Sequence, residues 1–190
     1  WPPASSSAAE TTWSSWDSDE FGCDRLERAL SRRLSSALPR LHAALVAAEG
    51  LPAPLDAGRD LALAHVAVAL RLMGIGASAP AALEDAVGAE VGLATGAAGP
   101  AGSPLFGVPE DYAAYRPRGT CEGDVVREAR FRAFTWLGRR GFRVADERET
   151  AAAILLARAV GRDPALREAF DATESVLGRL RAPPTLVAKV

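Results

Sequence analysis

Apolar residues occupy nearly every position of the stretch LALAHVAVALRLM, from Leu61 to Met73. A surface helix carries one apolar stripe beside a polar face, whereas a helix that is apolar all round lies inside a bundle. The stretch is shorter than the roughly 20 residues that a membrane-spanning helix needs. The alternation within it would also suit a buried strand, but its alanines and leucines favour a helix. We therefore predict a central helix over 61–73, with a polar entry at 58–60 and an exit at Gly74.

Amphipathic patterns predict further helices around this one. Leucines recur at every third or fourth position between 24 and 50, and Pro39 predicts a kink or break near Leu38. Other helices are expected after Pro80, over 122–140, over 146–161 and from Asp163 onward. The sequence therefore predicts an all-α fold, a single bundle of about six or seven helices around the central helix 61–73, with extended N- and C-terminal arms.

The chain divides into three parts by composition. Residues 1–22 form an extended arm rich in serine and acidic residues, without a helical period, and 183–190 form an extended C-terminal tail. The helical domain covers 23–182 and contains a loop rich in glycine and proline over 94–109. The chain begins at Trp1 rather than at methionine, and we take this as a sign of processing or trimming.

Composition excludes several kinds of chemistry. The net charge is −2, the only lysine is Lys189, and asparagine and glutamine are absent, a bias that a GC-rich coding sequence explains. Without a Gly-Lys pair there is no phosphate-binding P-loop. Two histidines and two cysteines, all far apart, form no recognisable zinc site. We therefore predict no cofactor, no metal and no enzymatic activity.

Cys121 requires separate consideration, because a helix start can lower the pKa of a thiol. A nucleophilic thiol also needs a base, and His42 and His65 are the only histidines. A disulfide between Cys23 and Cys121 is one alternative, and we expect free thiols instead. A small helical enzyme or ligand carrier with a pocket near His65 or Cys121 remains an alternative function.

The helix expected over 122–140 has apolar residues on two sides. Phe131 and Phe134 fall beside Arg127 and Arg130, opposite the face that we expect to be core. That expected core face contains Val125, Val126, Ala129, Ala133, Trp136 and Leu137. Because arginine and aromatic residues concentrate binding energy at protein interfaces, we predict that Arg127, Arg130, Phe131 and Phe134 contact a partner.

The N-terminal arm carries its own candidate anchors. Trp13, Trp16 and Phe21 are large aromatic residues in an otherwise polar segment. The acidic stretch 10–24 is also complementary in charge to the arginine-rich helix, so it is a candidate ligand for that helix in the same chain or in a second copy.

These observations favour a non-enzymatic structural or adaptor subunit that binds one or more protein partners, or further copies of itself, within a larger assembly. The alternative from another class is a nucleic-acid-associated helical protein that uses the arginine and aromatic residues of 122–143. The negative net charge argues against nucleic acid as the ligand. No transmembrane segment is expected.

Overall fold

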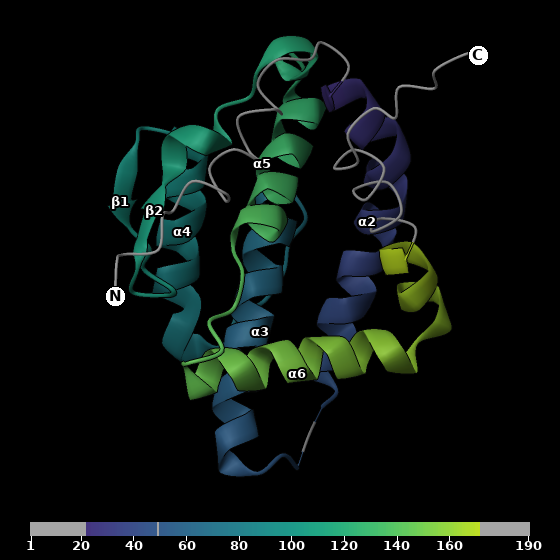
Figure 1. Cartoon of the computed structure of the whole chain (residues 1–190), viewed down its shortest axis with the longest axis vertical. Coiled ribbons are helices and arrows are strands. Elements are labelled where there is room, and N and C mark those ends of the chain that lie inside the picture. Colours follow the sequence, from purple (N-terminus) through teal and green to yellow (C-terminus); the bar gives the residue numbers. More distant parts are fainter. Residues whose placement is uncertain (1–21, 49, 172–190) are drawn as a thin grey trace, which may run out of the picture.

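The computed structural model describes residues 22–48 and 50–171, and describes side chains from residue 33 onward except at 49 and 120. Most of this part is helical, which confirms the predicted all-α class (Figure 1). The long helices are α2 (Gly22–Val46), α3 (Ala53–Leu72), α4 (Glu84–Gly96), α5 (Val125–Arg139) and α6 (Glu147–Arg162), and a further helix is described over 164–171. Short 3-10 turns cover Ala81–Leu83, Tyr112–Tyr115 and Gly119–Cys121. Almost all of the arm predicted over 1–22, and all of the tail over 183–190, lie outside the described residues.

Helix α3 is the centre of the fold, as the sequence predicts. Every residue from 61 to 70 is buried, and α3 contacts α2, α4, α5 and α6. The helix begins earlier than predicted, at Ala53, with Pro52 as its N-cap and Pro54 in its first turn. Proline suits the start of a helix because the first amide groups have no partner inside the helix. Residues 58–60 therefore lie within α3, and the helix does not begin after them as predicted.

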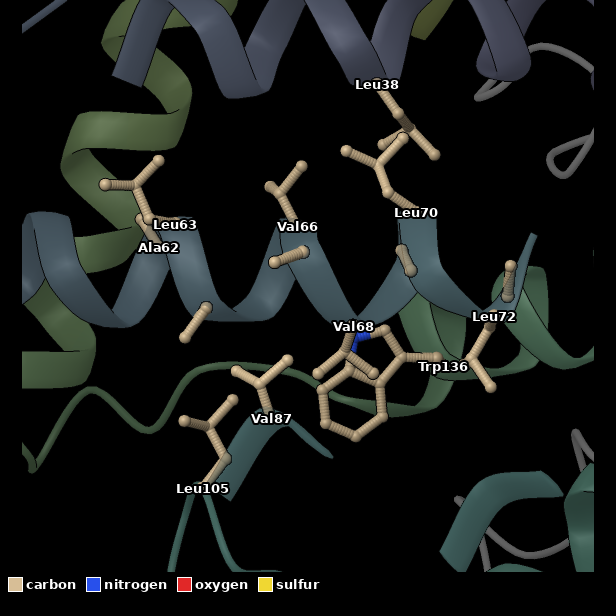
Figure 2. Packing of buried hydrophobic residues seen from close by; sticks show 14 of the residues in the cluster. Leu38, Ala62, Leu63, Val66, Val68, Leu70, Leu72, Val87, Leu105 and Trp136 are labelled. Atoms are coloured by element: carbon tan, nitrogen blue, oxygen red, sulfur yellow. The ribbon is translucent and has the colours of Figure 1, made fainter. Parts of the chain in front are cut away.

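Opposite sides of α3 pack against different helices. Figure 2 shows Leu38 of α2 beside Leu70 on one side, while Trp136 of α5 lies on the other side, below Val68. Val87 of α4 and Leu105 also lie on that second side. This arrangement explains why the pattern of α3 has no polar face.

Helix α2 continues through Pro39, so the predicted break is wrong. Leu34, Leu38, Leu41 and Leu45, on both sides of the proline, are all buried. A proline inside a helix costs about 3 kcal/mol, and burying one leucine side chain contributes about 1.5–3 kcal/mol. Packing of the leucine stripe on one continuous helix therefore outweighs the local cost.

Helix α6 crosses α3 at close range (Figure 1). A Cβ atom at Gly58 would lie 2.4 Å from the Cβ of Ala151 and 2.8 Å from the backbone nitrogen of Ala152. Only glycine therefore fits at this position of α3. Helix α6 also passes through Gly161, where its end was expected, and stops at Arg162.

A short β-hairpin follows α4, where the sequence predicts only a loop over 94–109. Strand β1 (Pro100–Gly102) pairs antiparallel with β2 (Pro109–Asp111). In the turn between them Leu105 and Phe106 are buried. Strands of three residues are too short to show a period of two, so the pattern did not reveal them.

Within the described ranges, no helix has the length and apolar character needed to span a bilayer.

Candidate functional site

Four of the predicted partner-binding residues lie together on α5. Arg127, Arg130, Phe131 and Phe134, here called the α5 stripe, are spaced so that they share one face of the helix. Each is half-buried. The other three, Trp13, Trp16 and Phe21, lie outside the described residues.

The first turn of α5 projects from the fold. Asp124 is the N-cap, and its carboxylate accepts hydrogen bonds from the amides of Val126 at 2.9 Å and Arg127 at 3.1 Å. Val125 is 81% exposed and Val126 is 55% exposed, so their assignment to the core is wrong. Ala133, two turns further on, is fully buried as predicted. The helical wheel gives the correct direction of the core face but does not say where along α5 the neighbouring helices cover it.

Carboxylates within the protein pair with several arginines of α5 and of the connection that follows it. Arg127 lies 3.7 Å from Asp124, and Arg132 lies 3.2 Å from Glu128. Beyond α5, Arg143 bonds through its guanidinium to Glu149. This region therefore has a weaker positive field than the number of its arginines suggests.

A second cluster joins the hairpin to α4 and α5. We call it the hairpin junction, and it consists of Glu90, Ser103, Glu110, Tyr112 and Arg140, all buried. The Glu90 carboxylate accepts hydrogen bonds from the hydroxyls of Ser103 (2.8 Å) and Tyr112, and from the amide of Leu105 (3.2 Å). Burial, with the bond to Glu90, raises the pKa of Tyr112. Tyr112 therefore stays protonated and acts as a donor.

Glu110 holds the other half of the junction. Its carboxylate lies 2.9 Å from Nε of Arg139 and 3.2 Å from Nη1 of Arg140. The Arg140 guanidinium also lies 4.5 Å from the ring centre of Phe106, a cation–π contact. Strand β2 is thus fixed to the end of α5 by buried charges.

His65 lies at the centre of an aromatic cluster with Phe106, Trp136 and Phe142. The imidazole centre is 6.0 Å, 5.2 Å and 5.1 Å from the centres of these three rings. Trp136 donates from Nε1 to the backbone carbonyl of His65 at 3.0 Å, which fixes α5 against α3. Burial, reinforced by the positive charge of Arg140, lowers the pKa of His65 to about 3. The ring is therefore neutral at physiological pH.

Cys121 is buried and disulfide-bonded, so the expectation of a free thiol at this position is wrong. The side chain of Cys23, the other cysteine of the sequence, is outside the described residues. A half-open hollow of about 230 Å³ lies between the end of α4 and the hairpin. Glycines, alanines, Leu93, Pro100 and Tyr112 line it, and neither His65 nor Cys121 does.

The hairpin junction and the first turn of α5 are suited to different roles. The carboxylates of the hairpin junction are buried and already bonded to donors within the chain, which is the pattern of a structural network. Among the described residues no group of three or more His, Cys, Asp or Glu side chains is arranged to hold a metal ion. The first turn of α5, in contrast, presents apolar and charged side chains to solvent.

Sequence reasoning missed Glu90 and Glu110. Glu90 is the only charged residue of the apolar run 86–101, and a charge in such a run is a signal that a buried partner exists. Glu110 gave no comparable signal, because it lies in a segment of mixed polarity.

No curated protein and no solved structure matches this chain. Residues 26–180 match the model of the family described as "Protein of unknown function (DUF3160)", a range that includes α3, α5 and the whole hairpin junction. The chain therefore belongs to the DUF3160 family.

Proposed function

We propose that this protein is a non-enzymatic structural or adaptor subunit that binds a protein partner through the α5 stripe and the exposed first turn of α5. The observation that carries the proposal is the exposure of Val125 and Val126 in the first turn of the helix that also carries the half-buried phenylalanines and arginines of the α5 stripe. Exposed apolar surface beside arginine and aromatic residues is typical of protein interfaces.

The state of the reactive groups supports the same proposal. Glu90 and Glu110 are bonded within the hairpin junction, and His65 is enclosed by aromatic rings. A general base must reach a substrate proton to act on it. The core thus encloses Glu90, Glu110 and His65, while His42, nearer the surface, lies with Nε2 2.8 Å from the Ser78 carbonyl.

Photocrosslinking in cells of the source organism tests the proposal. Val126 is replaced by p-benzoylphenylalanine in the full chain, and irradiation is expected to give one discrete protein adduct. Val144, which is 88% exposed in the connection between α5 and α6, is the matched control site, because it is also a solvent-facing valine but lies past the opposite end of α5. Adducts of equal yield at both sites, or no adduct at Val126, would contradict the proposal.

Charge reversal gives the second arm of the test. Arg127→Glu with Arg130→Glu should abolish the adduct at Val126, while Arg148→Glu on α6 should leave it unchanged. An adduct between two copies of this chain would identify the partner as a second copy and the assembly as a homo-oligomer.

The ion pairs within α5 favour a protein ligand over nucleic acid. Asp124 and Glu128 already neutralise Arg127 and Arg132, so few charges remain to release counterions from phosphates. Steep salt-dependent binding of a single-stranded oligonucleotide, lost on Arg130→Glu, would reverse this preference.

A further inference from the structure

His65 joins four separate parts of the chain. The residue belongs to α3, while its three ring neighbours come from the hairpin turn (Phe106), α5 (Trp136) and the connection to α6 (Phe142). Phe106 and Phe142 also contact each other, with ring centres 6.0 Å apart. A change in the charge or position of the His65 ring would therefore alter its contacts with the hairpin turn, with α5 and with the connection to α6.

The surroundings accept a neutral imidazole and oppose a charged one. Nδ1 of His65 is buried without a hydrogen-bond partner, and the neighbouring charge that acts on the ring, Arg140, is positive. Carboxylates on the adjacent elements are bonded elsewhere. Glu110 on β2 holds Arg139 and Arg140, Glu90 on α4 holds Ser103 and Tyr112, and Glu149 on α6 holds Arg143. A proton on His65 would therefore be a buried charge without compensation.

The hairpin turn packs against fewer elements than α3 does. Its backbone bonds are local, from Ser103 N to the Val108 carbonyl and from Gly107 N to the Ser103 carbonyl, each 2.8 Å long. The bonds of Ser103 and Leu105 to Glu90 also hold it. At Phe106, the carbonyl accepts a hydrogen bond from Nη2 of Arg143 at 3.3 Å, and the ring contacts His65 and the guanidinium of Arg140. Helix α3, by comparison, packs against four helices. Because local opening follows the path of lowest free energy, the hairpin opens before α3 does.

We propose that the hairpin turn, residues 103–108, is an acid-released clip, in which protonation of His65 lifts this turn off α3 while α2, α3 and α6 stay folded. Acid would thereby uncover the aromatic face of α3 and α5, a conformational change that is independent of the partner-binding function proposed above.

Hydrogen exchange of the full chain, measured by mass spectrometry at pH 7 and pH 5, tests the proposal. After correction for intrinsic exchange rates, the amides of Leu105, Phe106 and Gly107 should lose protection about tenfold for each pH unit below 6.5. Interior amides of α3 and α6 exchange only through more extensive unfolding, so they should remain better protected than the hairpin amides at both pH values.

Three variants separate His65 from other causes. His65→Leu and His65→Phe each remove the titrating group, so the protection of the hairpin amides should become insensitive to pH between 7 and 5. Two replacements of different shape are used because either one alone could introduce a packing defect. His42→Gln is the control, because His42 is the only other histidine and its Nε2 lies 2.8 Å from the Ser78 carbonyl, away from the cluster. A pH response that survives in His65→Leu and His65→Phe, or hairpin amides as well protected at pH 5 as those of α3 and α6, would overturn the proposal.

Discussion

Two junctions hold this protein together by different physics. At the crossing of α3 and α6, Gly58 meets Ala151 and Ala152 so closely that a single methyl group would not fit. At the hairpin junction, Glu90 and Glu110 are buried and each is bonded to groups from other parts of the chain. The stability of the helix crossing depends on side-chain volume, and its glycine and alanines do not titrate. The stability of the hairpin junction depends on each buried charge keeping its partner.

Loss of Glu110 should have the largest effect. Glu110→Ala leaves Arg140 buried without its carboxylate, which should lower the free energy of unfolding by about 3–5 kcal/mol. Urea denaturation followed by circular dichroism measures this change. The double variant Glu110→Leu with Arg140→Met removes both charges and should recover most of the loss. A double variant as unstable as Glu110→Ala would show that the junction depends on shape and not on charge.

Added volume at the helix crossing should come next. Gly58→Ala places a Cβ 2.4 Å from the Cβ of Ala151, so the helices must separate, at a cost of about 1–3 kcal/mol. Gly88→Ala on α4 is the matched control, since a Cβ there has no atom within 4 Å. It should stabilise the protein by about 0.5–1 kcal/mol, because alanine is the better helix former. If the two substitutions had the same sign, the close crossing would not be what constrains Gly58.

Acid should weaken the aromatic cluster by a comparable amount. The pKa of His65 is about 3 in the folded protein and 6.5 in the unfolded chain, so the unfolded chain binds more protons between these values. The free energy of unfolding should therefore fall as pH decreases below 6.5, by about 2 kcal/mol at pH 5. Urea denaturation at both pH values, in the natural sequence and in His65→Leu, measures the difference. An equal decrease in both proteins would assign it to other groups.

The smallest effect on stability is expected where the partner is proposed to bind. Val125→Ser and Val126→Ser change exposed side chains, so each should alter the free energy of unfolding by less than about 0.5 kcal/mol. Binding of the partner, measured by the crosslink from a probe at Phe134, should nevertheless decrease. A large loss of stability would instead indicate that these valines are covered within the folded chain.

Sequence reasoning was most successful where one residue pattern decides the structure alone. The uninterrupted apolar run of α3 predicted a central helix. It failed at Val125 and Val126, where the outcome depends on how far the neighbouring helices extend. It also failed at Pro39, where packing of the leucine stripe outweighs the local cost of the proline.

The sequence by itself determined the helical class, the central position of α3 and the side of α5 that faces the core. These features follow from the periodicity of apolar residues, which is a local property and can be read in every helical turn. Tertiary structure alone decided that Gly58 is a contact point, that Glu90 and Glu110 are buried, and that His65 meets rings from three other segments. These features arise between residues that are far apart in the chain, and the free energy of such a contact is fixed only when folding brings both partners into the same low-dielectric interior.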